Sequence, residues 1–161
     1  MYNLKKLNRQ LKAYTFFKIP LAFFVSPKIT TFNDQSFCIR IPLNFRTRNH
    51  LKCMYFGALA VGADLSSGFL AYELIRRSKQ PIQLIFKSLN ARFLRRAESA
   101  VYFTCNDGQR IHDLVNRALL SQQREETTLT VIATTPDTLG NEPVATFELV
   151  LSLKAKPLTK K

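Results

Sequence analysis

The sequence predicts a single α+β domain in which a curved antiparallel sheet wraps around one long helix. Residues 53–78 form a long, mostly apolar stretch without proline, and several later segments alternate apolar and polar residues, as half-buried strands do. Strands joined by short turns form an antiparallel sheet, and another element must cover its apolar face. Residues 53–78 are long and apolar enough to cover it, and 161 residues suffice for one domain with a real core.

Small residues recur at helical spacing in the predicted central helix and should share one face with a single acid. We expect a sheet or another helix to approach this face closely, because each interior glycine costs about 1 kcal/mol relative to alanine and must be offset by packing. A membrane span is the less favoured alternative, since a charge at its midpoint is expensive. The residues of this face are Gly57, Ala60, Val61, Asp64, Ser67, Gly68 and Ala71.

The N-terminal segment at residues 3–17 is predicted to be an amphipathic helix that lies on the domain, with a membrane-surface helix as the alternative. A signal peptide fits poorly, because Lys18 and Pro20 interrupt the following apolar run. We therefore divide the chain into an N-terminal helix and linker, the folded domain, and a flexible basic tail. Their expected boundaries are 1–27, 28–154 and 155–161.

The remaining elements are predicted from the spacing of apolar residues and from turn-forming residues. Two strands should meet at a tight Asn33-Asp34 turn before the central helix, and four strands should follow it, with a short helix between the second and third. In the strand after the central helix, Ile85 is expected on the same face as Leu89, Ala91 and Phe93. The last strand should present Ala145, Phe147, Leu149, Leu151 and Leu153 on one face. The predicted strands are 28–33, 35–41, 83–94, 99–105, 127–135 and 144–154, and the short helix is 110–121.

The formal net charge of +13 is concentrated in the first two thirds of the chain. Residues 1–50 carry nine Lys or Arg and one acid, residues 51–100 carry eight and three, and residues 101–161 carry seven of each. This balance favours an anionic partner: a phosphorylated cofactor, an acidic carrier protein, nucleic acid or a membrane surface. The three cysteines form no CxxC pair, so we expect no metal site or disulfide framework and a reducing, cytoplasmic location.

Asp64 is the first candidate for chemistry, because its neighbours in the sequence are apolar or small. Desolvation raises the basicity of a carboxylate, which is what a general base needs. The alternative is an ordinary helix acid that points to solvent. Asn49 and His50 precede the helix by a few residues, and their simpler roles are those of a loop or capping residue and a surface histidine.

The string N-HLKCMYF-G-ALAVGA-D-LSSGF, from Asn49 to Phe69, resembles the signature of hotdog-fold acyl-CoA thioesterases of the phenylacetate-pathway type, and of the allied hotdog domain of unknown function. The family's asparagine and catalytic aspartate are separated as Asn49 and Asp64 are. Its second glycine falls on Gly57. Tyr55 and Phe56 replace the family's histidine and first glycine, which changes the width expected of the thioester pocket.

The resemblance implies a mechanism and a set of site residues. Asp64 would activate water or attack a thioester carbonyl, Asn49 would orient the water or carbonyl, and the N–H of Gly57 would help to hold the oxyanion. The substrate would be an acyl-CoA or an acyl-carrier thioester, with coenzyme A entering only as part of the substrate and no other cofactor. The residues expected to bind it are His50, Tyr55, Phe56, Arg92, Arg95 and Arg96.

The resemblance also implies a homodimer, or a dimer of dimers, with each site at the subunit interface. Asn49 of one chain would then face Asp64 of the partner subunit. We expect no nucleic-acid partner and no transmembrane segment. Two alternatives stay open: a non-catalytic hotdog protein that binds an acyl chain or acyl carrier, motivated by Phe56, and a basic nucleic-acid or membrane-surface binder, motivated by the charge.

Overall fold

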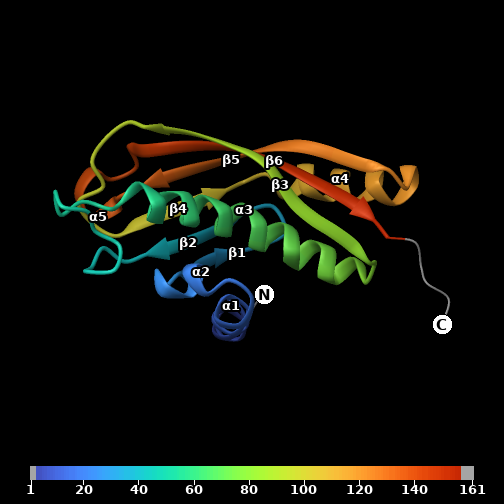
Figure 1. Cartoon of the computed structure of the whole chain (residues 1–161), viewed down its shortest axis with the longest axis horizontal. Helices are drawn as coiled ribbons and strands as arrows, with labels where there is room; N and C mark the ends of the chain where they lie inside the picture. The colour runs from blue at the N-terminus through green and yellow to red at the C-terminus, as the bar shows by residue number, and fades with distance from the viewer. Residues whose placement is uncertain (1–2, 157–161) are drawn as a thin grey trace.

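The computed structural model describes residues 3–156 and has the predicted architecture, a six-stranded antiparallel sheet against one long helix (Figure 1). The strands follow the order β1-β2-β4-β5-β6-β3, so β1 and β3 are the two edges. In chain order the elements are α1 (Leu4–Lys18), α2 (Pro20–Phe24), β1 (Lys28–Phe32), β2 (Phe37–Ile41), α3 (Phe56–Ser78), β3 (Ile82–Phe93), β4 (Val101–Cys105), α4 (Gly108–Ser121), β5 (Arg124–Thr134), α5 (Pro136–Leu139) and β6 (Pro143–Ala155).

The central helix α3 begins at Phe56, three residues later than predicted. Met54 forms an isolated bridge with Arg48 and donates its N–H to the carbonyl oxygen of Ala97 at 2.8 Å, which keeps the chain extended up to the helix. Among the described helices, α3 alone has the length and apolar composition of a membrane span, and 67% of its most apolar window is buried in the fold. Such burial is typical of a core helix.

The small-residue face of α3, which a sheet or another helix was expected to approach closely, is only partly covered. Gly57, Ala60, Val61, Asp64 and Gly68 are half-buried, and only Ser67 and Ala71 are fully buried. The other buried residues of α3 include large side chains that fill the space inside the curved sheet. These residues are Ala58, Leu59, Gly62, Ala63, Leu65, Ser66, Phe69, Leu70, Glu73, Leu74 and Ile75.

Among the glycines of α3, Gly62 makes the closest approach to the sheet. A Cβ atom at this position would overlap the ring of Phe103 on β4, one of the largest fully buried side chains. The glycine therefore allows the helix to contact the centre of the sheet, where a larger residue would push the two apart.

The face of β3 differs from the prediction because of a β-bulge between Phe86 and Ser88. Before the bulge, Leu84 and Phe86 pack against the core and Ile85 points outward; after it, Ala91 packs against the core. The extra residue shifts the alternation by one position, so Ile85 does not share a face with Ala91. In β6, by contrast, the five predicted inward residues are all buried, as expected.

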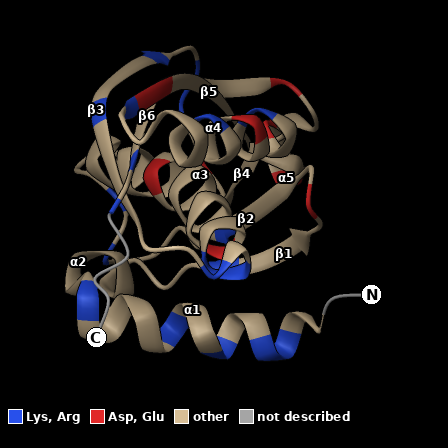
Figure 2. Ribbon diagram, turned by 90° about the vertical axis from the view of Figure 1, so that its right-hand side faces the viewer, with Lys and Arg blue, Asp and Glu red and all other residues tan. Residues whose placement is uncertain are grey.

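The helix α1 lies along the outer edge of β1 and over the C-terminal half of α3 (Figures 1 and 2). Its own residues Leu7 and Leu11 are buried against the domain. The Asn8 side chain accepts the N–H of Ile29 at 2.8 Å and donates to the carbonyl oxygen of the same residue at 3.0 Å. The Asn8 side chain thus takes the place of a neighbouring strand at Ile29, on one edge of the sheet. No described element covers β3 at the other edge.

The C-terminal strand is longer than predicted, since β6 extends to Ala155. The predicted tail begins at this residue, and residues 157–161 lie outside the described part of the chain.

Candidate active site

The loop before α3 is held in a fixed shape by Asn49. Its side-chain oxygen accepts the N–H of Leu51 at 2.9 Å, and its side-chain nitrogen lies 3.3 Å from the sulfur of Cys53. Its own N–H bonds the carbonyl oxygen of Cys53 at 2.8 Å, which closes a tight turn in which Lys52 has φ of 63°. Asn49 therefore has the simpler role expected from the sequence, that of a residue that shapes a loop. This turn also fixes the position of its side-chain amide group.

This loop, the start of α3 and the segment after β3 enclose a cavity of about 560 Å³, here called the loop cavity. It brings together most of the residues predicted to bind substrate, although they lie far apart in the sequence. Arg95, for example, comes from the segment after β3 and also pairs with Glu142 at 3.0 Å. The predicted residues that line the loop cavity are Asn49, His50, Tyr55, Phe56, Arg95 and Arg96, whereas Arg92, Gly57 and Asp64 are not among its lining residues.

The N-terminus of α3 faces this cavity without a cap. Tyr55, at the N-cap position, makes no side-chain hydrogen bond to the first turn, and that turn contains no acid. The first N–H groups of a helix have no partner within the helix and attract negative charge. A Cβ atom at Gly57 would overlap the ring of Tyr55, so glycine at this position lets the aromatic ring fold back over the first turn.

Aromatic rings form one wall of the loop cavity. The rings of Tyr55 and Phe56 lie 4.7 Å apart, and Phe93 from β3 lies 6.4 Å from Phe56. Phe56 is 59% exposed and Phe93 51%. The sequence resemblance implied Tyr55 and Phe56 as site residues but not Phe93. The alternation of apolar residues predicted Phe93 only as part of a strand.

Asp64 lies in a second, smaller cavity of about 160 Å³, here called the acid cavity. Its carboxylate is half-buried, and burial raises the pKa of Asp64 above its ordinary value. Within residues 3–156 this carboxylate has no hydrogen bond or ion pair. The other residues that line the acid cavity are Tyr14, Ile19, Leu65, Gly68, Phe69, Tyr72, Leu84 and Phe86.

Two tyrosines, Tyr14 and Tyr72, line the acid cavity with Asp64 and were not predicted as site residues from the sequence. Tyr72 follows Asp64 by eight residues, so the i, i+4, i+8 spacing could have placed it on the same helix face. Tyr14 comes from α1, and nothing local in the sequence indicates this contact. Burial raises the pKa of Tyr14, and Tyr72 and the charge on Asp64 raise it further.

Within one chain, the two halves of the predicted site are separate. Asn49 lines the loop cavity and Asp64 lines the acid cavity. From Phe56 to Asp64 the helix advances eight residues, or about 12 Å along its axis. Within residues 3–156, no three His, Cys, Asp or Glu side chains are close enough to share a metal ion.

The second acid of α3, Glu73, is buried and is not among the residues that line the acid cavity. Its side chain is only 1% exposed and pairs with Arg76 at 2.8 Å. Arg77 lies further away, at 4.0 Å. A buried, paired carboxylate is poorly suited to react with a substrate.

A single helix held by a curved antiparallel sheet, with the sheet order found here, defines the hotdog fold that the resemblance in residues 49–69 implied. The chain belongs to the family described as Domain of unknown function (DUF4442), whose sequence profile matches residues 8–151. A search of curated proteins found no significant match.

Solved structures share this fold at low sequence identity. A Pseudomonas aeruginosa protein described as a probable thioesterase has a TM-score of 0.77 and 24% identity, with 97% of this chain and 99% of that chain covered. A Chlorobaculum tepidum protein of unknown function has a TM-score of 0.82 and 11% identity, covering 95% and 97%. A Haemophilus influenzae thioesterase has a TM-score of 0.71 and 14% identity, covering 100% and 96%. These TM-scores establish a shared fold.

Proposed function

We propose that the protein is a thioesterase that hydrolyses an acyl thioester of coenzyme A or of an acyl carrier. The observation that carries the proposal is the carboxylate of Asp64. It is half-buried, opens into a cavity and has no hydrogen bond or ion pair among residues 3–156. A carboxylate that served only stability would be expected to have a hydrogen-bond donor or a cation beside it, as Glu73 has.

The proposed reaction uses Asp64 as a general base or as the nucleophile. As a base, it takes a proton from water while the water oxygen attacks the thioester carbonyl, and the thiolate leaves when the tetrahedral intermediate collapses. The uncapped N–H groups at the start of α3, including that of Gly57, stabilise the oxyanion. Asn49 orients the water or the carbonyl from the adjoining loop.

We further propose that each active site forms between two copies of the chain. The distance along α3 supports this, because about 12 Å of helix separates Asp64 from the N-terminus of its own helix. The open edge of β3 supports it too. Ile85, Leu89 and Phe93 on that strand are 39%, 42% and 51% exposed, and an unpaired edge is a template for another strand. Pairing two β3 strands about a two-fold axis would place Asn49 opposite Asp64 of the partner subunit.

The loop cavity is the proposed site for the thioester and the neighbouring part of its carrier. Its aromatic wall suits an acyl or pantetheine-like chain, and His50, Arg95 and Arg96 lie at the same cavity. Arg96 forms no ion pair with a described residue, whereas Arg95 shares its charge with Glu142. Arg92 lies on the edge strand outside this cavity, where it is proposed to meet phosphates only in the assembled dimer.

The test of this function is release of free thiol from a panel of acyl-CoAs that differ in chain length and aromatic character, and from an acyl-carrier thioester. We expect turnover of at least one member, lost in the Asp64→Asn variant. A folded wild-type protein that hydrolyses none of them, but whose melting temperature rises with an acyl-CoA, would instead support the second candidate.

That second candidate is a hotdog protein that binds an acyl chain or an acyl carrier without hydrolysing it. Phe56 favours it, because its large ring stands at the first position of α3 beside the N–H groups proposed to hold the oxyanion. The Phe56→Gly variant distinguishes the two functions. It should raise turnover if the ring only narrows the entrance, and leave no turnover if the chain is a binding protein.

A further inference from the structure

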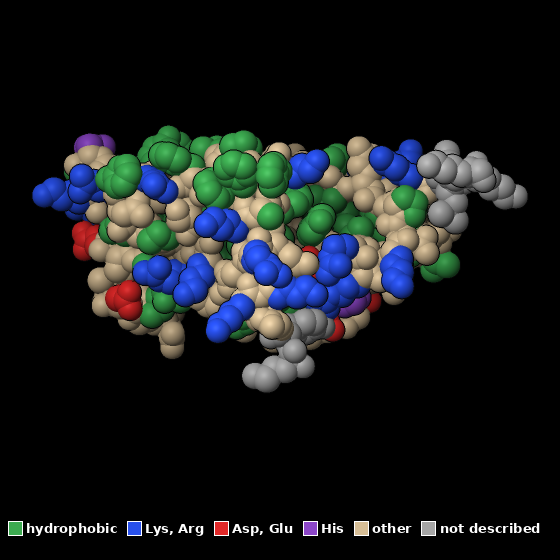
Figure 3. All heavy atoms as spheres, turned by 90° about the horizontal axis from the view of Figure 1, so that it is seen from below, with side chains coloured by type: hydrophobic (Ala, Val, Ile, Leu, Met, Phe, Trp, Pro, Cys, Tyr) green, Lys and Arg blue, Asp and Glu red, His purple; other side chains and the backbone are tan. Residues whose placement is uncertain are grey.

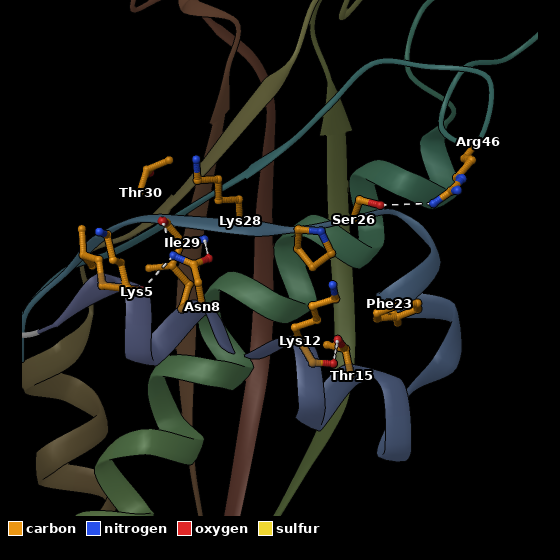
Figure 4. Close-up of a pocket in the computed structure, with 12 residues that line it drawn as sticks. Lys5, Asn8, Lys12, Thr15, Phe23, Ser26, Lys28, Ile29, Thr30 and Arg46 are labelled. Atoms are coloured by element: carbon orange, nitrogen blue, oxygen red, sulfur yellow. Dashed lines mark hydrogen bonds between the residues drawn. The ribbon is translucent and has the colours of Figure 1, made fainter. Parts of the chain in front are cut away.

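A wide groove lies between α1, α2 and β1 and shares no lining residue with the loop cavity or the acid cavity (Figure 4). Its volume is about 910 Å³, larger than that of the loop cavity. Figure 4 shows Lys5 at one end, Arg46 at the other, and Lys12 and Lys28 between them. No acid is among its lining residues, which we call the basic groove: Leu4, Lys5, Asn8, Lys12, Thr15, Phe23, Ser26, Pro27, Lys28, Ile29, Thr30 and Arg46.

The four cations of the basic groove form no ion pair with any residue in the described range 3–156. Arg46 donates to the hydroxyl of Ser26 at 3.4 Å and lies over the rings of Phe24 and Phe45, 5.4 Å from each centroid. The helix α1 contributes five basic residues and no acid (Figure 2). Uncompensated positive charge at a groove is complementary to phosphate groups.

Exposed apolar side chains adjoin the groove at its α2 end. Phe16 stacks edge-on with Phe17 at 4.9 Å and with Phe23, a groove residue, at 5.1 Å. We call the following residues the apolar patch; their exposed fractions are 54% for Phe16, 75% for Phe17, 67% for Leu21, 49% for Phe24 and 72% for Phe45. Figure 3, viewed from the side of α1, shows hydrophobic and basic side chains gathered on this face with few acids.

We propose that the basic groove and the apolar patch together dock the protein on an anionic lipid bilayer. The phosphates of lipid headgroups enter the groove and contact Lys12, Lys28 and Arg46, while Phe17 and Leu21 enter the acyl boundary. An amphipathic helix with a basic polar face and large apolar side chains binds membranes in this manner. Nucleic acid is the other polyanion that basic and aromatic side chains bind, and the experiment below therefore includes it.

The experiment is co-sedimentation of the full chain with vesicles of phosphatidylcholine, alone or mixed with phosphatidylserine. We expect binding only to the mixed vesicles, with release by added salt because surface charges are then screened. The Lys12→Gln, Lys28→Gln double variant should bind more weakly by about fivefold for each charge removed. The matched control Arg110→Gln, Arg117→Gln removes the same charge from α4, which lies in the upper half of Figure 2, away from α1 at the bottom. It should change binding by less than about twofold.

The apolar contribution has its own variant and control. Phe17→Ser with Leu21→Ser should reduce binding to the mixed vesicles, whereas Leu120→Ser, at an 86% exposed position on α4, should not. Equal binding to both kinds of vesicle, or loss of binding in the α4 controls, would overturn the proposal. So would DNA or inorganic phosphate binding to the groove without vesicle binding, or a dimer in light scattering that the Phe17→Ser, Leu21→Ser variant dissociates. None of these measurements depends on thioester hydrolysis.

Discussion

The ring of Tyr14 on α1 lies 4.7 Å from the ring of Tyr72 on α3, at the mouth of the cavity that holds Asp64. Tyr14 also meets Phe69 edge-on at 6.3 Å. Through these contacts the N-terminal helix closes one side of the acid cavity and limits the access of water to the carboxylate. The helix is therefore part of the surroundings of the candidate base and does more than cover the edge of the sheet.

Replacing Tyr14 by phenylalanine tests whether its hydroxyl group supports the ionised form of Asp64. The ring contacts remain, so the melting temperature should change little. Loss of the polar hydroxyl should make the cavity less favourable to charge, which moves the acid limb of the pH–rate profile to higher pH. The measurement is thiol release across a pH series, with Tyr102→Phe on β4 as a control that leaves α1 and α3 unchanged. An unaltered acid limb would mean that the hydroxyl does not act on Asp64.

Replacing Asp64 by asparagine should lower turnover by about 10²- to 10⁴-fold, the range typical for a general base. The control is Asp113→Asn, which alters an exposed carboxylate on α4. Turnover by the Asp64→Asn enzyme at the wild-type rate, measured as released thiol, would exclude this residue from the chemistry.

The Asp64→Asn substitution should also change the free energy of unfolding, by an amount that depends on pH. Because burial raises the pKa of Asp64 in the folded state, that state holds its proton more tightly than the unfolded chain. The wild-type protein therefore loses stability as the pH rises from the ordinary aspartate pKa through the raised one. Denaturant unfolding should show Asp64→Asn to be at least as stable as wild type at neutral pH, with the advantage shrinking in acid. A variant that is less stable at neutral pH would indicate an undetected partner for the carboxylate.

Shared active sites can be tested by mixing two chains that are each impaired at a different residue of the site. Asn49→Ala should lose less activity than Asp64→Asn, because an orienting group contributes less than the reacting group. Random pairing of the two variants by co-refolding leaves about a quarter of all sites intact in a two-fold dimer. Thiol release should therefore recover toward that fraction of wild type. Light scattering that shows a fully active monomer would contradict both the dimer and the shared site.

Gly62 provides a test of the packing between α3 and the sheet. Alanine usually stabilises a helix by about 1 kcal/mol over glycine. Here its Cβ would overlap Phe103, so we expect Gly62→Ala to lower the free energy of unfolding by about 1–3 kcal/mol. The matched control is Gly68→Ala, whose Cβ would lie 3.1 Å from the ring of Phe86 and 3.7 Å from a carboxylate oxygen of Asp64, without overlap. Equal stabilities of the two variants in denaturant titrations would show that the overlap relaxes without cost.

The element order could be predicted from the sequence because it depends on local period and turn residues. Asn33, for example, accepts the N–H groups of Gln35 and Ser36 at 2.9 and 2.7 Å, which forms the turn that its side chain favours. The exposed face of β3 could not be predicted, since the bulge after Phe86 has no residue signature and shifts every later side chain. Which face of α3 is buried depended on the curvature of the sheet, a long-range property.

The candidate site could be predicted in part. The motif placed Asn49, Tyr55 and Phe56 near one another because they are close in sequence, and the structure gathers them at one cavity. Arg95 joins them only through the fold, as the resemblance implied. Tyr14 was not predictable as a neighbour of Asp64, because that contact depends on how α1 docks across the rest of the chain.

The two ends of the sheet differ in a way that limits how many copies can join. At β1, Asn8 already occupies the backbone N–H and carbonyl groups of Ile29 that a further strand would need. At β3 the corresponding groups have no such cover within the described chain. Strand addition at β1 would have to displace Asn8, whereas addition at β3 displaces no described group. A second copy that joins through its own β3 uses up the free end of both chains, so growth terminates at a pair and an extended fibre of folded subunits cannot form by this route.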